Sequence, residues 1–197
     1  MARRSHGDDA TMRRVEATKR RVSFADLQRM PDDGNRYELY DGELHVVPSP
    51  NLLHQIVAGR LYEVVREYSV ATGGVALFAP LDIVLTDYDV VEPDVLYFGP
   101  KAIPRLEPLR HPRFPPDLAV EVLSPSTRGI DRGRKSELLA RHHVPEYWLV
   151  DPQGRSLEVR LEQDGRYPNP IVITDGRYES RTLPGLIVET EPLFVWP

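Results

Sequence analysis

Hydrophobic residues recur at helical spacing along residues 50–70, and a second segment of this kind lies near residues 130–142. The pair Gly73-Gly74 follows the first segment and indicates where that helix ends. Shorter apolar runs predict strands at 75–85, 94–98, 117–123 and 146–150. Because strand 117–123, a helix and strand 146–150 follow one another, we expect a right-handed crossover unit with two parallel strands.

Turn signals predict smaller elements toward both ends of the chain. These signals are Asp41-Gly42, Asp164-Gly165 and Asp175-Gly176. The first lies between the runs 37–40 and 44–47 and predicts a β-hairpin, and the other two predict a small hairpin within residues 156–195. Residues 99–116 carry six prolines and predict a loop that is longer than most in compact domains, which is typical of functional loops.

These elements together predict a mixed α/β (α+β) fold. A central mixed sheet is expected to be flanked by helices, with β-hairpin additions at the N-terminal and C-terminal ends. The chain has 197 residues, of which 41% are hydrophobic, so it is long enough to bury one core. We expect a single domain over residues 23–197, preceded by a tail.

Two carboxylates interrupt runs that otherwise have the character of buried strands. Glu121 lies within the apolar run 117–123, where alternation places it on one face with Ala119 and Leu123. Asp94 stands at the start of the apolar strand 94–98. An ionised carboxylate in an apolar setting is costly unless it is paired or binds a metal ion. We therefore expect Asp94 and Glu121 to bind a divalent cation together.

A lysine stands on the helical stripe that is expected to face the core. Lys135 shares this stripe with Leu138, Leu139 and His142. The chain has three lysines among 25 basic residues, so a lysine here is a specific choice over arginine. The alternative is an ordinary surface ion pair with Asp131, one turn earlier, which would stabilise the helix by about 0.2–0.5 kcal/mol.

Composition restricts the kind of metal site and the location of the protein. The chain has no cysteine, so disulfides and thiolate metal ligands are excluded. Any cation would be bound by oxygen or imidazole ligands, which favours Mg²⁺ or Mn²⁺ over zinc. No apolar stretch is long enough to span a membrane, and residues 1–22 lack the apolar core of a signal peptide. We therefore expect a cytoplasmic protein without a membrane partner.

Charge is unevenly distributed along the chain. Residues 1–22 contain seven basic and three acidic residues and predict a basic, disordered tail. The net charge of the whole chain is −5, so the remainder carries −9, and we expect weak non-specific affinity for nucleic acid. Three further arginines, Arg128, Arg132 and Arg134, lie beside Lys135 in the sequence and are the expected nucleic-acid contacts of the domain.

Six motifs in the sequence carry a family resemblance. They are RYELYDGEL, SPxxxHQ, VEPDV, PDLAVEVLSPSTR, DxxxK and VPEYWLVDP. In this order they resemble the Uma-two family of endonucleases, a bacterial branch of the PD-(D/E)xK phosphodiesterase superfamily with a restriction-endonuclease-like fold. The resemblance covers residues 23–195. It implies that Asp94 and Glu121 are the acidic residues of the superfamily motif.

The chain departs from the superfamily motif at one position. Leu123 stands where the motif has its lysine. The resemblance implies that the lysine has moved to the following helix, where Lys135 stands. Catalysis would then involve Asp94, Glu121 and Lys135.

Other residues are secondary candidates, each with an ordinary alternative. Glu38 is either a metal or substrate contact or a plain solvent-facing strand residue. His54, in the first turn of the long helix, is either a phosphate contact or proton carrier, or a capping or core histidine. Asp82, Glu63 and Glu67 are candidates for completing a metal shell.

Metal-assisted hydrolysis of nucleic acid, with DNA as the expected substrate, fits these residues best. A two-fold homodimer would suit the cutting of both strands of a duplex. One alternative is a nucleic-acid- or protein-binding module that has kept the fold and lost activity. Another is a glycosidase that uses two carboxylates and requires no metal.

Overall fold

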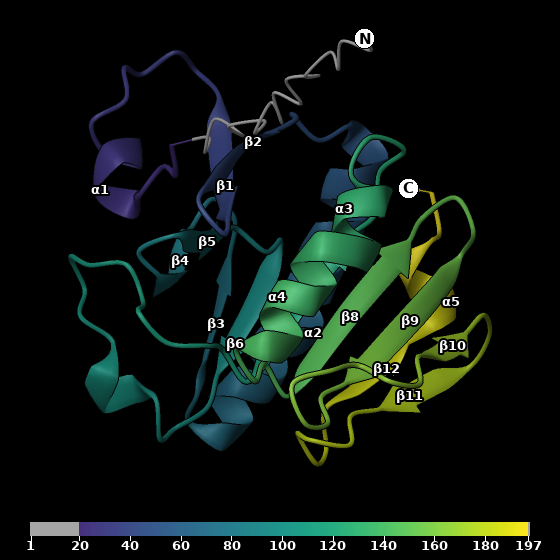
Figure 1. Cartoon of the computed structure of the whole chain (residues 1–197). Coiled ribbons are helices and arrows are strands. Elements are labelled where there is room, and N and C mark those ends of the chain that lie inside the picture. Colours follow the sequence, from purple (N-terminus) through teal and green to yellow (C-terminus); the bar gives the residue numbers. More distant parts are fainter. Residues whose placement is uncertain (1–19, 197) are drawn as a thin grey trace, which may run out of the picture.

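The computed structural model describes residues 20–196 and shows a mixed α/β architecture (Figure 1). Its main sheet has six strands in the order β10-β9-β8-β7-β6-β3. The strands are β3 (Val75–Phe78), β6 (Val95–Phe98), β7 (Leu118–Val122), β8 (Glu146–Asp151), β9 (Ser156–Leu161) and β10 (Ile171–Ile173). Neighbours pair antiparallel except for β7 and β8, which are parallel, as expected of the crossover unit.

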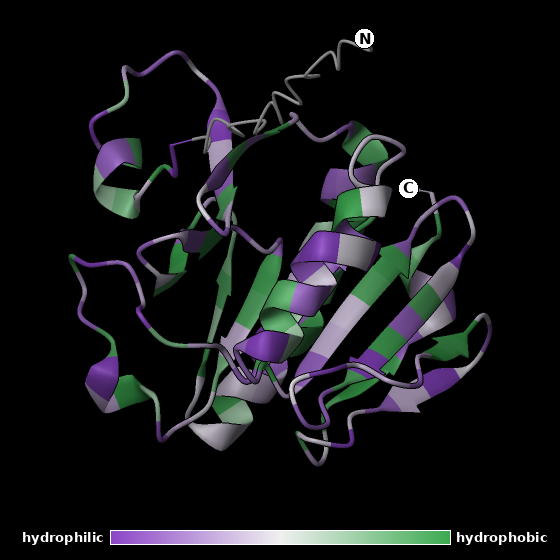
Figure 2. Ribbon diagram, in the orientation of Figure 1, coloured by the Kyte–Doolittle hydropathy of each residue, from purple (hydrophilic) through white to green (hydrophobic). Residues whose placement is uncertain are grey.

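Helices cover both faces of this sheet. The long helix α2 (Leu52–Thr72) packs against the face that carries Leu118, Val120 and Val122. A second helical segment, formed by α3 (Arg128–Ile130), the π-helical turn η2 (Asp131–Lys135) and α4 (Ser136–Arg141), packs against the opposite face. The central strands β7 and β8 are therefore buried on both sides, and Figure 2 shows hydrophobic green toward the arrowhead end of β8.

A smaller sheet holds the N-terminal hairpin. Its strands are β1 (Arg36–Tyr40), β2 (Glu43–Val47), β4 (Ile83–Thr86) and β5 (Asp89–Val91), which pair antiparallel in the order β2-β1-β5-β4. The hairpin turn has positive φ at both Asp41 and Gly42, which matches the twist of the flanking strands. The short helix α1 (Phe24–Leu27) precedes the hairpin.

The remaining elements are short. The loop after β6 contains the 3₁₀ turn η1 (Ile103–Arg105). The chain ends with β11 (Arg177–Glu179) and β12 (Ile187–Glu189), which pair antiparallel, and α5 (Thr190–Leu193). No helix among residues 20–196 is both long and apolar enough to cross a membrane.

Capping explains the bounds of α2. The side chain of Asn51 accepts a hydrogen bond of 2.9 Å from the backbone N–H of His54, which satisfies an otherwise free donor. Gly73 ends the helix with φ of 76°, a left-handed conformation that glycine adopts without steric cost. The expected helix over 50–70 is thus confirmed.

Three sequence-based expectations need correction. The expected strand 75–85 is two strands, β3 and β4, in different sheets. Residues 156–195 are more than a small hairpin, because β9 and β10 extend the main sheet. The helix expected near 130–142 covers 128–141 and includes a π turn, for which spacing gave no signal.

The boundary of the basic tail also moves. Residues 1–19 lie outside the described residues, so most of the expected tail is untested. Arg21 and Val22 are part of the fold: Arg21 Nε donates to the Asp41 carbonyl at 2.7 Å, and the Val22 N–H donates to the Gly42 carbonyl at 2.8 Å.

Candidate active site

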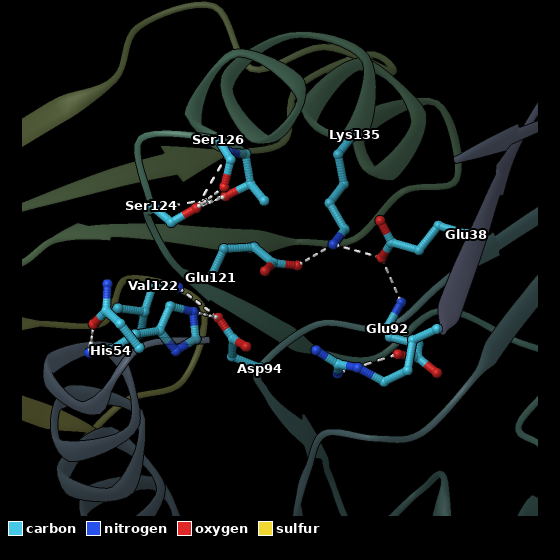
Figure 3. Close-up of polar contacts among 12 residues, drawn as sticks. Glu38, His54, Glu92, Asp94, Glu121, Val122, Ser124, Ser126 and Lys135 are labelled. Carbon is cyan, nitrogen blue, oxygen red and sulfur yellow. Dashed lines mark hydrogen bonds and ion pairs between the residues drawn. The ribbon is translucent and has the colours of Figure 1, made fainter. Parts of the chain in front are cut away.

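A buried ammonium group joins the two sheets. Lys135 is 3% exposed, and its Nζ forms ion pairs with Glu121 of β7 and, at 2.6 Å, with Glu38 of β1 (Figure 3). The alternative interpretation of Lys135 as the partner of Asp131 in an ordinary surface ion pair is therefore wrong, because both residues are buried. Leu123, where the superfamily motif has lysine, lies in an apolar cluster with Leu139.

Local structure directs each of these side chains inward. The alternation of β7 places Glu121 on the face that the second helical segment covers. Lys135 is the last residue of the π turn and points toward Glu121 from above that face (Figure 3). Turns of this kind are rare and frequently occur at functional sites.

Glu38 is fixed by further donors. The Tyr40 hydroxyl donates to Oε2 at 2.5 Å, and the backbone N–H of Glu92 donates to Oε1 at 2.7 Å. Glu38 is 5% exposed, so its alternative role as a plain solvent-facing residue is wrong. Tyr40 and Glu92 were not predicted from the sequence as neighbours of the site. Spacing gave a signal only for Tyr40, which shares a strand face with Glu38.

Asp94 lies next to this group, just before β6. Val95 pairs with Val120, so extending the antiparallel register by one residue places Asp94 opposite Glu121. The backbone N–H of Val122 donates to Oδ2 of Asp94 at 2.8 Å. Nε2 of His54, on α2, lies 3.2 Å from the same oxygen. Within the described part of the chain, Nδ1 of His54 is buried without a hydrogen-bond partner.

Burial and neighbouring charges shift several pKa values at the site. Burial raises the pKa of Glu121, and the ammonium of Lys135 opposes this only in part. Burial alone would lower the pKa of Lys135, but the carboxylates of Glu121 and Glu38 outweigh it and raise the pKa, so the ammonium stays protonated at neutral pH. Burial raises the pKa of Asp131 to about 6.

These side chains meet at a pocket of about 310 Å³. Its walls include Glu38, His54, Asp94, Glu121 and Lys135. The turn after β7 forms another wall, where the hydroxyls of Ser124, Ser126 and Thr127 hydrogen-bond to one another. The pocket therefore has acidic, cationic and neutral hydrogen-bonding groups within reach of one ligand.

The donor set fits a magnesium-type cation. Among residues 20–196 no three His, Cys, Asp or Glu side chains are arranged as a complete metal site. Mg²⁺ nevertheless binds proteins through one or two carboxylates and keeps several waters. Glu121 and Glu38 pair with one ammonium and Asp94 lines the same pocket, so the surplus of negative charge there favours a cation. Asp94 and Glu121 are the residues that would hold it.

The remaining candidates lie elsewhere. Asp82 does not line the pocket; its Oδ2 lies 3.7 Å from Nδ1 of His111, and its carboxyl hydrogen-bonds to Glu92. Glu63 and Glu67 are exposed on α2 around a different hollow, so their proposed place in a metal shell is wrong.

The three arginines beside Lys135 have partners within the protein. Arg128 donates to Gln153 at 3.2 Å, and Arg132 pairs with Glu158 at 3.1 Å. Arg134 pairs with Glu43 at 2.7 Å and donates to the Tyr40 carbonyl. None of the three lines the pocket, although other residues of the same helical segment do. Their expected contact with nucleic acid stays a prediction.

The chain matches a protein family in sequence and a solved structure in fold. A family model described as "Putative restriction endonuclease" matches residues 24–191. The crystal structure of "a putative nuclease belonging to DUF820" from Anabaena variabilis ATCC 29413 superposes with a TM-score of 0.74. The match covers 88% of this chain and 97% of that chain at 19% identity, so it shows a shared fold. Among curated proteins, none matches the chain significantly.

Proposed function

Because the chain belongs to the Uma2 family, whose model is described as "Putative restriction endonuclease", we propose that it hydrolyses phosphodiester bonds in nucleic acid with a divalent cation. One observation carries the proposal: the buried ammonium of Lys135 lies between Glu121 and Glu38 at a pocket that Asp94 also lines. Burying a charged lysine is costly, and buried ionisable groups that line a pocket are typical of functional sites.

The two acidic residues on neighbouring strands would hold the cation. Asp94 and Glu121 offer oxygen ligands, which suit Mg²⁺ or Mn²⁺. When bound, the cation would polarise the scissile phosphate and lower the pKa of the attacking water. The Val122 N–H and Nε2 of His54 both lie against Oδ2, so Oδ1 would be the oxygen that is available to the cation.

Lys135 supplies a compact positive charge with three donors. Its ion pair with Glu38 would hold the ammonium while a ligand engages Glu121. From there it would orient the attacking water or stabilise the negative charge that develops on the phosphate. Glu38 is thus a positioning residue for the lysine, and Tyr40 in turn fixes Glu38.

His54 has a comparable positioning role for Asp94. A hydrogen bond from Nε2 to Oδ2 would hold the carboxylate in one orientation, as outer partners of metal ligands commonly do. The substrate we expect is duplex DNA, and a two-fold dimer would allow one active site for each strand.

Calorimetry with Mg²⁺ and Mn²⁺ on the wild type and on Asp94→Ala tests the metal site without a substrate. We expect binding by the wild type only. Cleavage of DNA and of RNA, with and without EDTA, then tests the reaction. Cleavage that persists in EDTA would contradict the proposal and would favour metal-independent carboxylate chemistry.

A further inference from the structure

The long loop between β6 and β7 gathers positive charge around a groove. Arg105, Arg110 and Arg113 line this groove of about 370 Å³ together with His111, and α1 supplies the other wall (Figure 1). All three arginines are exposed. We refer to Arg105, Arg110 and Arg113 as the loop surface. Because the chain as a whole carries a net charge of −5, this concentration of arginines is a local exception.

The loop surface is held in place by the fold. The backbone N–H of Val84, on β4, donates to the Pro112 carbonyl at 2.9 Å and ties the loop to the smaller sheet. The Arg105 guanidinium lies over the Phe114 ring, 3.8 Å from its centroid. Stacking orders the guanidinium while its N–H groups remain at the edge, and that edge matches the geometry of a phosphate.

Acidic neighbours neutralise the other two arginines only weakly. Arg110 pairs with Glu107 at 3.0 Å, and Arg113 pairs with Asp87 at 2.5 Å. All four side chains are more than half exposed. Exposed pairs of this kind contribute about 0–1 kcal/mol, so a phosphate can replace either carboxylate at small cost.

The loop surface is close to the candidate active site. His111 lies beside the loop surface and contacts Asp82, whose carboxyl hydrogen-bonds to Glu92 at the pocket wall. A chain of contacts through His111, Asp82 and Glu92 therefore links the loop surface to the pocket wall.

We propose that the loop surface binds the phosphate backbone of the nucleic-acid substrate, beyond the phosphate that is cut. This inference rests on the proposed function, because it extends the same substrate along the protein. Arginines that engage phosphates position a nucleic acid without reading its sequence. The loop surface would thus supply affinity that the acidic remainder of the chain does not.

The test removes the three charges and keeps a polar side chain at each position. The variant Arg105→Gln/Arg110→Gln/Arg113→Gln is compared with a control, Arg66→Gln/Arg177→Gln/Arg181→Gln, which changes the net charge equally at exposed arginines on α2 and near β11. Affinity for a short labelled DNA duplex, and for an RNA duplex of the same sequence, is measured in EDTA at several salt concentrations. Circular dichroism verifies the fold of both variants.

Log affinity falls as log salt rises, and this dependence should become less steep in the loop variant. We expect the magnitude of the slope to decrease by about 2 to 3 in the loop variant and by less than 1 in the control. An unchanged slope in the loop variant, an equal effect of the control, or no binding by the wild type would each overturn the inference. The proposed function fails separately: a wild type that binds through the loop surface but cuts neither nucleic acid would retain this inference and refute catalysis.

Discussion

The ammonium of Lys135 lies 2.6 Å from Oε1 of Glu38, so the second helical segment and the N-terminal hairpin meet inside the protein. The same ammonium pairs with Glu121 of the main sheet. One cation therefore connects three elements of the chain, β1, β7 and the π turn. The contribution of this cation to stability can be measured separately from its contribution to catalysis.

The metal ligands are tested by conservative changes. Asp94→Asn and Glu121→Gln should each abolish Mn²⁺ binding and nuclease activity, because each removes an anionic ligand. The fold should persist, since Lys135 keeps Glu38 as a partner after Glu121 is changed. Calorimetry gives the affinity, and Glu63→Gln, at an exposed carboxylate on α2, is the control. Wild-type metal affinity in either variant would mean that the ligands are misassigned.

Removing the ammonium should affect turnover more than metal binding. Lys135→Met should lower turnover by about 10²–10⁴-fold, which is the usual effect of losing one positioned charge or proton-transfer group. Lys135→Arg should recover little activity, because a planar guanidinium does not fit where a compact ammonium was. Full activity in Lys135→Met would leave the lysine with a structural role only.

The free energy of unfolding of Lys135→Met separates a loss of stability from a loss of catalysis. Lys135→Met leaves two buried carboxylates without their partner, which should cost on the order of 3–5 kcal/mol in the free energy of unfolding. The double variant Glu38→Gln/Lys135→Met should regain part of this loss but none of the turnover. Urea unfolding and single-turnover kinetics measure the two effects separately.

His54 should act on metal affinity through Asp94. In His54→Gln the side-chain amide can still donate to Oδ2, so Mn²⁺ affinity should stay close to that of the wild type. His54→Leu removes the donor and should weaken Mn²⁺ binding by about 10–100-fold. Equal affinities in the two variants would show that the contact does not orient the carboxylate, and a crystal structure of His54→Leu would show whether Asp94 has turned.

Asp131 should make the protein less stable as the pH rises. Its pKa is raised from 3.8 to about 6 by burial, so the folded state holds a proton that the unfolded state releases. The free energy of unfolding should fall between about pH 4 and pH 6, by on the order of 2–3 kcal/mol from this group. Asp131→Asn should remove this part of the decline, as urea midpoints across the range would show. Identical pH profiles for variant and wild type would contradict the assignment.

The basic N-terminal segment is tested by truncation before the docked residues. Removing residues 1–19 keeps Arg21 and Val22, which hydrogen-bond to the hairpin turn. We expect weaker nucleic-acid binding and a flatter salt dependence, since fewer phosphates are neutralised. An unchanged slope would show that the segment does not contribute to binding.

Periodicity predicted the parts of the site that lie within single elements. Strand alternation placed Glu121 on a buried face, and helical spacing placed Lys135 on the inward stripe, which the structure confirms. The partner of Lys135 was harder to predict. Asp131 is one turn away in sequence, whereas Glu38 comes close only because two sheets pack together.

Other features had no signal in the sequence. Arg132 and Arg134 had the composition of a phosphate-binding cluster, but the glutamates that pair with them come from β9 and β2. The division of residues 75–85 between two sheets depends on where the chain turns, and an apolar run alone does not indicate this. Such features arise from tertiary packing, which a local pattern does not encode.

The π turn at Asp131–Lys135 makes the site sensitive to chain length. Deleting one residue there would restore an ordinary α-helix and rotate the residues before the deletion by about 100° relative to those after it. Asp131 and Lys135 stand at the two ends of this turn, so both could not keep their present directions. When related chains are aligned, a one-residue gap at this turn is therefore a change in the architecture of the active site, even where every motif residue is present.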